Sequence, residues 1–178
     1  MTAADIDAVA ALRVRGWQHA YAGLMPHAYL AAMSVAEDAA ERGRMFAAAG
    51  DRVTQLVAED PADPGGTPTG WAALGPYRPD GPHARGEQAA GGELYALYVR
   101  PGLIGTGIGR ALPEDCLERA VARGFPRLLL WVVEGNVRAR RFYERAGFTP
   151  DGAVDTHDVE GTPVSEVRYG RRLFSGVV

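Results

Sequence analysis

Cysteine is nearly absent from this 178-residue chain. Its one cysteine, Cys116, excludes an internal disulfide and the cysteine cluster of a structural zinc site. The four histidines form no metal-binding pattern, so no metal is expected. An excess of basic residues is lacking too, because the formal net charge is -3. Nucleic-acid binders normally need a basic surface to neutralise phosphates, so the charge argues against DNA or RNA as a partner.

Long apolar runs are also lacking. No run approaches the roughly 20 residues of a membrane-spanning helix, and the N-terminal sequence MTAADIDAVA has neither the basic nor the apolar region of a signal peptide. We therefore expect a cytoplasmic protein without membrane contact. Hydrophobic residues make up 47% of the chain, enough for one buried core, so residues 1–178 are predicted to form a single domain.

The spacing of apolar residues predicts helices and strands that alternate along the chain. In the N-terminal half we expect a helix that ends near His19, a helix from about Ser34 to Ala49, and strands at 53–59 and 70–74. In the C-terminal half we expect strands at 93–99 and 128–133, helices after Ile108 and Asn136, and two antiparallel strands within 148–171 around a turn at Glu160 and Gly161. This pattern predicts an α/β fold.

A glycine-rich segment joins the strand at 93–99 to the helix that follows. It lacks the Gly-Lys-Ser/Thr of an ATP-binding loop, and its glycines do not match the dinucleotide-binding spacing in either register. Glycines nevertheless let a phosphate approach backbone N–H groups at the positive end of a helix. The loop therefore predicts a site for a phosphate-bearing ligand, with a strand-to-helix turn that binds nothing as the alternative.

These segments resemble the GNAT superfamily of acetyl-CoA-dependent N-acetyltransferases. Its members carry a loop Gln/Arg-x-x-Gly-x-Gly/Ala after the fourth strand, and residues 104–109 are similar except that Ile104 replaces the polar first residue. Residues 136–148, Asn-x-x-Ala-x-x-x-Tyr-x-x-x-Gly-Phe, are similar to the family's second cofactor segment at every fixed position. Residues 15–26 resemble one common bacterial branch, so the resemblance covers most of the chain.

The resemblance implies the GNAT fold. This fold is a central mixed, mostly antiparallel twisted sheet flanked by helices, with a splay between the fourth and fifth strands that holds acetyl-CoA. Members usually begin with a short edge strand, so here that strand is either missing or reduced to residues 1–4. Acetyl-CoA is the implied co-substrate, and a homodimer is the family-based expectation.

The resemblance also implies which residues contact coenzyme A. They belong to the strand at 93–99, the glycine loop and the helix after Asn136. The expected contacts are Leu97, Tyr98, Val99, Ile104, Gly105, Thr106, Gly107, Ile108, Gly109, Arg110, Asn136, Arg140 and Tyr143.

The expected reaction is attack of an amine on a thioester. An amine with a pKa of about 10.4 is mostly protonated at neutral pH, and removing that proton costs roughly 4 to 5 kcal/mol. Glu93 resembles the glutamate that many members place on this strand, and we expect it to accept the proton directly or through water. Simple alternation along the strand predicts that Glu93 faces the same way as Leu97 and Val99. A solvated carboxylate at the end of the strand is the alternative.

Further roles follow from the resemblance. The backbone N–H of Leu97 is expected to hold the thioester oxygen, and the backbone of Val99 to pair with the pantetheine arm. Tyr143 is expected to donate a hydrogen bond to the departing sulfur, with a purely structural core tyrosine as the alternative. The candidates for the acceptor site are aromatic residues: Trp17, Tyr21 and Tyr95.

Three functions remain open at this point. The first is direct acetyl transfer to a primary amine of a small molecule or peptide in a ternary complex, without a covalent enzyme intermediate, because Cys116 lies on the helix beyond the loop. The second is a non-catalytic sensor of acyl-CoA. The third is a transferase that uses another acyl donor, such as succinyl- or propionyl-CoA. The sequence does not identify the acceptor.

Overall fold

The computed structural model describes residues 1–60, 63, 65–78 and 91–174. The helices within these ranges are α1 (Ile6–Ala20), α2 (His27–Ala32), α3 (Val35–Ala49), α4 (Ile108–Ala122) and α5 (Val137–Arg145). The strands are β1 (Thr54–Glu59), β2 (Pro68–Pro76), β3 (Gly92–Val99), β4 (Arg127–Val133), β5 (Thr149–Val159) and β6 (Thr162–Arg172). No helix in the described ranges is long and apolar enough to cross a bilayer.

The helix ends reflect local sequence signals. Ser34 caps α3, since its hydroxyl accepts a hydrogen bond from the N–H of Glu37 at 3.3 Å. The predicted cap Asn136 is confirmed: its side-chain oxygen accepts from the N–H of Ala139 at 3.1 Å. The short helix α2 was not predicted, although Pro26 immediately before it is a common helix-start signal.

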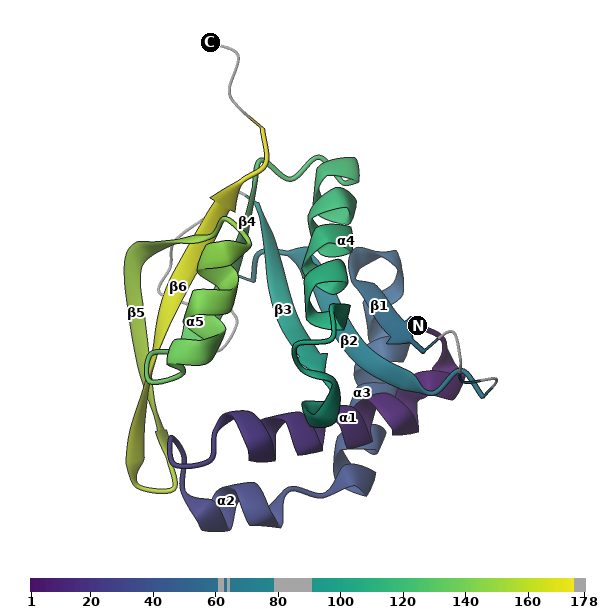
Figure 1. The fold of residues 1–178 in the computed structure, drawn as a ribbon, viewed down its shortest axis with the longest axis vertical. Coiled ribbons are helices and arrows are strands. Elements are labelled where there is room, and N and C mark those ends of the chain that lie inside the picture. The colour runs from purple at the N-terminus through teal and green to yellow at the C-terminus, as the bar shows by residue number, and fades with distance from the viewer. Residues whose placement is uncertain (61–62, 64, 79–90, 175–178) are drawn as a thin grey trace.

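The strands form one mixed sheet in the order β1-β2-β3-β4-β6-β5 (Figure 1). Neighbours are antiparallel except β3 and β4, which are parallel. No strand precedes α1 among the described residues, because residues 3–5 form a 3₁₀ turn, although the amino group of Met1 donates to the carbonyl of Gln55 on β1 at 3.3 Å. The expected fold is confirmed, but the splay lies between the third and fourth strands of this chain.

Pairing between β3 and β4 is short. Their recorded pairs are Gly92 with Leu128 and Glu93 with Leu129. Beyond these residues the two ribbons diverge, and α1 passes below the open end (Figure 1). β4 remains paired with β6 as far as Val133, so the sheet stays continuous on that side of the gap.

A β-bulge lies in the middle of β3. The register with β2 passes from Ala73–Ala96 to Leu74–Leu94, which leaves Tyr95 as an extra residue on β3. An extra residue reverses the alternation of side chains beyond it. Even-numbered residues before the bulge and odd-numbered residues after it therefore lie on the same face of the sheet.

The bulge overturns one prediction. Leu94 packs with Leu97 and Val99 in the core under α4, because the extra residue brings an even-numbered position and odd-numbered positions to one face. Glu93 precedes Leu94 and points to the opposite face. Glu93 therefore does not face the same way as Leu97 and Val99, and lies instead on the side of the sheet that α1 and α3 cover.

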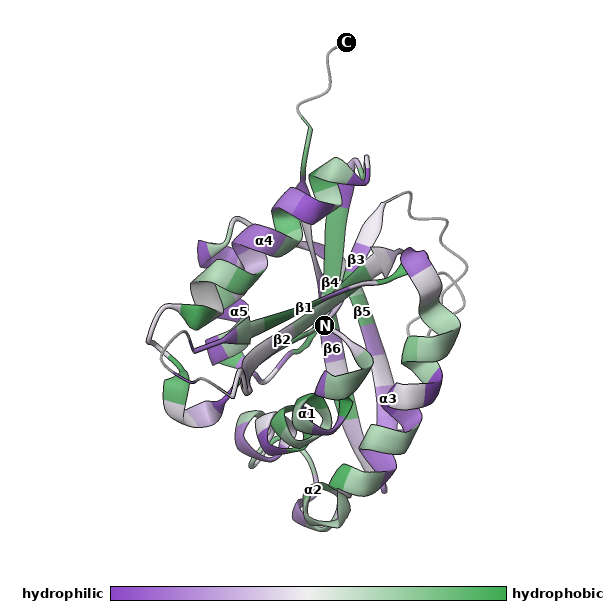
Figure 2. Cartoon of the chain, turned by 90° about the vertical axis from the view of Figure 1, so that its right-hand side faces the viewer, coloured by the Kyte–Doolittle hydropathy of each residue, from purple (hydrophilic) through white to green (hydrophobic). Residues whose placement is uncertain are grey.

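The core lies on both faces of the sheet, and the central strand β4 is largely hydrophobic (Figure 2). One cluster packs under α4 and α5, a second lies between α1 and the sheet, and a third joins α2 to the β5–β6 hairpin. Representative members of the three clusters are Leu112, Cys116 and Phe148; Val9, Leu12 and Trp71; and Met25, Leu30 and Val164.

Helix α1 approaches β3 closely at Gly16. A Cβ placed on Gly16 would lie 2.8 Å from Cδ1 of Tyr98. The Tyr98 ring has little freedom to move away, because its hydroxyl accepts a hydrogen bond from the indole of Trp17 at 2.6 Å and the ring stacks on Trp71 with 6.2 Å between centroids. Gly16 thus permits the contact that fixes α1 on the sheet.

We expect Gly16→Ala to lower the free energy of unfolding, because the new methyl group must displace Tyr98, and overpacking of this kind costs about 1 to 3 kcal/mol. Gly43→Ala is the matched control. Gly43 also lies inside a helix, but a Cβ there meets nothing within 4 Å, so alanine should stabilise the protein by about 0.5 to 1 kcal/mol. Urea unfolding measures both, and equal stabilisation by the two changes would contradict this account.

Candidate active site

Alternate residues of β3 direct their backbone N–H and C=O groups toward the gap between β3 and β4. The N–H of Arg100 donates to the carbonyl of Thr69 at 2.8 Å, so Arg100 and Thr69 are a hydrogen-bonded pair that continues the ladder between β3 and β2. In an antiparallel ladder every second residue bonds to its partner strand, so Tyr98 also points to β2. The backbone groups of Leu97 and Val99 therefore point the other way, toward the side where β3 and β4 diverge.

This geometry separates the three β3 residues predicted to contact coenzyme A. Leu97 and Val99 present backbone donors and acceptors to the gap. Tyr98 does not, because its backbone is directed to β2 and its side chain packs beside Trp71 on the α1 face.

The glycine loop ends at the N-terminus of α4. Gly105 and Gly107 have φ angles of 94° and 103°, in the left-handed region that favours glycine. The N–H of Ala111 bonds back to the carbonyl of Gly107 at 3.2 Å, so the N–H groups of the three residues before it have no helical partner. These three are Ile108, Gly109 and Arg110; the side chain of Arg110 lies outside the described part of the structure.

Open space surrounds the two loop glycines. A Cβ at either position would meet nothing within 4 Å, so tight packing is not the reason for glycine there. The hydroxyl of Thr106 is used inside the loop, where it donates to the carbonyl of Leu103 at 2.7 Å. The side chain of Ile104 is exposed. The loop therefore offers backbone donors rather than side chains to a ligand.

Two predicted cofactor residues on or near α5 have structural partners. Asn136 caps the helix, as described above. The guanidinium of Arg140 donates through Nε to the hydroxyl of Tyr169 at 3.0 Å and through Nη1 to the carbonyl of Glu134 at 3.2 Å. These contacts hold Arg140 against the β4–β6 side, and contact with a phosphate stays a prediction.

Tyr143 lies on the face of α5 that packs against the core. Its ring meets Phe148 edge to face with 6.0 Å between centroids. Burial raises the pKa of Tyr143 well above its usual range, and the neighbouring Tyr98 and Cys116 add smaller contributions in the same direction. The phenol therefore stays protonated and can act as a hydrogen-bond donor.

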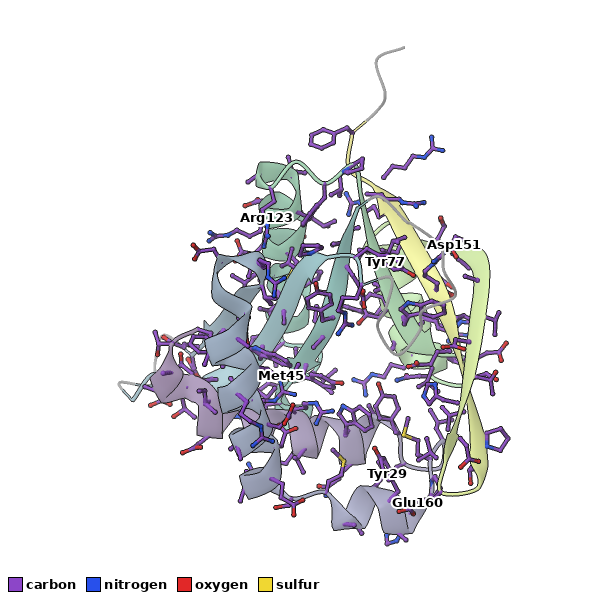
Figure 3. All side chains as sticks on the ribbon, turned by 180° about the vertical axis from the view of Figure 1, so that it is seen from behind. Tyr29, Met45, Tyr77, Arg123, Asp151 and Glu160 are labelled. Atoms are coloured by element: carbon purple, nitrogen blue, oxygen red, sulfur yellow. The ribbon has the colours of Figure 1, made fainter. Side chains whose placement is uncertain are left out.

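A cavity of about 710 Å³ lies on the other face of the sheet, between α1, α3 and strands β1 to β3. Trp17 and Tyr95, two of the predicted acceptor residues, line it, as do Met45 and Tyr77, which are labelled in Figure 3. The third, Tyr21, is not part of the lining. It packs against Trp17 with 5.0 Å between ring centroids and lies beside Tyr98.

Glu93 lies behind Arg78 when seen from this cavity. Its side chain is almost fully buried, and it accepts hydrogen bonds from the backbone N–H of Arg78 at 3.2 Å and from that guanidinium at 2.5 and 3.3 Å. The guanidinium also lies 4.0 Å from the ring centroid of Tyr95. Arg78 lines the cavity, whereas Glu93 is not among the lining residues.

The charged residues of the cavity were not predicted from the sequence. Asp38 accepts from Arg13 at 2.5 Å and from Arg42 at 2.7 Å, and the Arg42 guanidinium lies 4.3 Å from the centroid of the Trp71 ring. A signal was present, since Asp38, Arg42 and Met45 are spaced by four and three residues and so share one face of α3. That periodicity predicts the helix but not which strand residues it faces.

Cys116 is unsuited to nucleophilic chemistry. It is fully buried in the core under α4, and burial raises the pKa of its thiol to about 12. Reaction requires a thiolate in contact with its target. Among the described residues no group of His, Cys, Asp and Glu is arranged to hold a metal ion.

We therefore expect Cys116 to resist iodoacetamide in the folded protein at mildly alkaline pH and to react once urea unfolds the chain, because unfolding both exposes the thiol and restores its ordinary pKa. Mass spectrometry of timed samples measures the labelled fraction. Native protein that is labelled as fast as the unfolded chain would show that the thiol is accessible.

Comparison with known proteins agrees with this geometry. Residues 20–148 match the model of the acetyltransferase (GNAT) family. The uncharacterized N-acetyltransferase YuaI of Bacillus subtilis is 28% identical over 167 residues, covering 93% of this chain and 87% of that protein. A mycothiol acetyltransferase of Beutenbergia cavernae is 48% identical over 75 residues, which are 42% of this chain and 24% of that protein. The chain thus spans about a quarter of the length of the mycothiol acetyltransferases that it matches.

Solved structures show the same fold at low sequence identity. The PaiA N-acetyltransferase from Thermoplasma acidophilum, in complex with coenzyme A, has a TM-score of 0.71 at 18% identity and covers 97% of this chain and 95% of its own. The ribosomal-protein-alanine N-acetyltransferase from Brucella melitensis has a TM-score of 0.71 at 23% identity, with 97% of both chains covered. The family match spans most of the chain and the diverging strands match the family's fold, so this protein belongs to the GNAT acetyltransferase family and is an acyltransferase.

Proposed function

We propose that the protein transfers the acetyl group of acetyl-CoA to a primary amine by direct attack in a ternary complex. The observation that carries this proposal is the divergence of β3 from β4 beside the N-terminus of α4. The backbone N–H groups of β3 and those of the first turn of α4 then border the same gap. A ligand with an amide-containing arm and a phosphate group needs donors of both kinds. The coenzyme A complex of the similar Thermoplasma protein supports the choice of ligand.

The residues present fit acetyl-CoA as a substrate. The glycine loop and the first N–H groups of α4 would hold the pyrophosphate, where the helix dipole favours negative charge. The backbone of Val99 would pair with the amide groups of the pantetheine arm, as a neighbouring strand would. The N–H of Leu97 would stabilise the thioester oxygen as negative charge develops, a contribution of about 3 to 4 kcal/mol in comparable sites.

In the proposed reaction the amine nitrogen bonds to the acetyl carbon and the carbon–sulfur bond breaks. The protonated amine loses two protons in all, one before the attack and one as the amide forms; the coenzyme A thiolate takes up one from water and leaves as the thiol, so one proton is released. We assign proton acceptance to Glu93, reached from the cavity past Arg78. The arginines of the cavity wall assist, because nearby positive charge favours the neutral form of an amine.

Tyr143 is the proposed donor to the departing sulfur. A thiol has a pKa of about 8.5, well below that of a buried phenol, so proton transfer from Tyr143 to a thiolate is unfavourable. A hydrogen bond stabilises the sulfur without this transfer. Tyr143→Phe should therefore lower kcat while leaving binding of coenzyme A nearly unchanged, and full activity would reduce Tyr143 to a core residue.

We expect calorimetric titration to show binding of acetyl-CoA and of coenzyme A, and thiol release from acetyl-CoA to depend on an added amine. Propionyl- and succinyl-CoA in the same assay test the acyl preference. Binding of acetyl-CoA without release for any amine would favour a sensor over an enzyme, and absence of binding would exclude the proposed substrate.

We expect Gly107→Ala to weaken binding of coenzyme A about tenfold, which corresponds to about 1.4 kcal/mol, because alanine disfavours the left-handed backbone that aims the loop donors. Gly124→Ala is the matched control: Gly124 follows the other end of α4, its φ is +73°, and a Cβ there also meets nothing within 4 Å. Both changes should lower the free energy of unfolding by a similar amount. If both variants lose the same affinity for coenzyme A, the glycine loop is not part of the binding site.

We expect Glu93→Gln to lower kcat/KM by about a hundred- to ten-thousand-fold, as loss of a general base does, and to change its dependence on pH. Arg78→Gln separates this role from a structural one, since it breaks the ion pair but keeps the carboxylate. If the two variants lose the same activity and share one pH profile, Glu93 serves only to position Arg78.

A further inference from the structure

The cavity on the α1 and α3 face is lined by arginines that lack enough acidic partners. Arg13, Arg42, Arg52 and Arg78 line it, against the acidic residues Asp38 and Glu41. Arginine is always charged at neutral pH, so the charge of this wall depends on how each guanidinium is paired.

Asp38 serves two of these arginines at once. It accepts from Nη1 of Arg13 and from Nε of Arg42, so one negative charge stands between two positive ones. Within the described part of the chain, the terminal amino groups of Arg42 have no hydrogen-bond partner. Its side chain is only 13% exposed, which places an unbalanced charge in a largely desolvated position.

The remaining charges either cancel or add to this excess. Arg78 is balanced by Glu93, and Glu41 is balanced by an ion pair with Arg44, three residues further along α3. Arg52 has no ion-pair partner among the residues described here and contributes a second unbalanced positive charge. Two positive charges thus remain on one side of the cavity, on α3 and in the 3₁₀ turn that follows it.

Aromatic rings also line the cavity. Trp17, Trp71, Tyr95 and Tyr98 line the cavity from α1, β2 and β3. Tyr98 lies on the same strand as Leu97, whose N–H points to the gap. An acceptor in this cavity therefore meets aromatic surface and guanidinium groups together, since Arg42 lies 4.3 Å from the Trp71 ring centroid and Arg78 lies 4.0 Å from that of Tyr95.

We propose that the acceptor is a small amine that also carries a carboxylate, which Arg42 and Arg52 bind while the amine is directed toward β3. This inference rests on the proposed function and adds the class of acceptor. The same positive charges repel polyamines and other acceptors with several cationic groups. A carboxylate supplies the counter-charge that the cavity wall lacks and accepts the bidentate hydrogen bonds that a guanidinium offers.

The test compares each L-amino acid with its C-terminal amide and with its decarboxylated amine. Binding to the complex of the protein with coenzyme A is followed by tryptophan fluorescence, since Trp17 and Trp71 line the cavity. Thiol release from acetyl-CoA is measured separately. We expect at least one acid to bind at least about tenfold more tightly than its amide and its amine, the effect of losing about 1.4 kcal/mol.

Arginine variants locate the source of this preference. Arg42→Gln and Arg52→Gln should each reduce the ratio of acid to amide binding several-fold. Arg15→Gln should leave it unchanged, because Arg15 is exposed on α1 outside the cavity lining. Arg52 is also exposed, so its variant remains informative if Arg42→Gln destabilises α3, which thermal unfolding would reveal.

The outcomes separate the inference from the proposed function. Amides or decarboxylated amines that bind as tightly as the acids, or an acid preference that survives both arginine changes, would overturn the carboxylate site. Failure of every acid to bind would overturn it as well. Failure of acetyl-CoA to release thiol with any amine counts against the transferase, whereas acid binding by fluorescence is judged without turnover.

Discussion

The early end of hydrogen bonding between β3 and β4 is the constraint on which the site depends. Each strand keeps a full partner on its other side, β2 for β3 and β6 for β4, so the sheet remains intact while one strand edge faces the gap. Backbone N–H and C=O groups require partners. An extended ligand with amides can supply them as a strand would, which is the physical link between this topology and acyl-CoA chemistry.

The bulge at Tyr95 gives β3 a second role. Without the extra residue, Tyr98 would lie on the same face as Leu94, against α4. With it, Leu94 and Leu97 both pack under α4, and Tyr95 and Tyr98 join the wall of the cavity. One strand thus borders the proposed acyl-CoA site along its edge and the proposed acceptor site across its face.

Much of this architecture could be predicted from local patterns, because glycine loops, caps and apolar periodicity act over a few residues. The direction of the Glu93 side chain could not be predicted, since a bulge depends on how β2 pairs with β3. The only sign of the bulge in the sequence is that Leu94 and Leu97, which share one face, are separated by an odd number of positions. The arginine pairs of the cavity were also hidden, because Asp38 meets Arg13 across 25 residues. The ion pair of Arg78 with Glu93 depends on the same kind of tertiary contact.

The strand order also leaves β5 as an outer edge of the sheet. An uncovered edge invites pairing with other chains, and proteins discourage this with proline, charge and irregular backbone. β5 has all three: Pro150 lacks an N–H, Asp151 and Asp158 are exposed, and the register with β6 shifts between Pro150 and Val154. A long hairpin can therefore complete the sheet without seeding edge-to-edge aggregation, which favours solubility at high concentration.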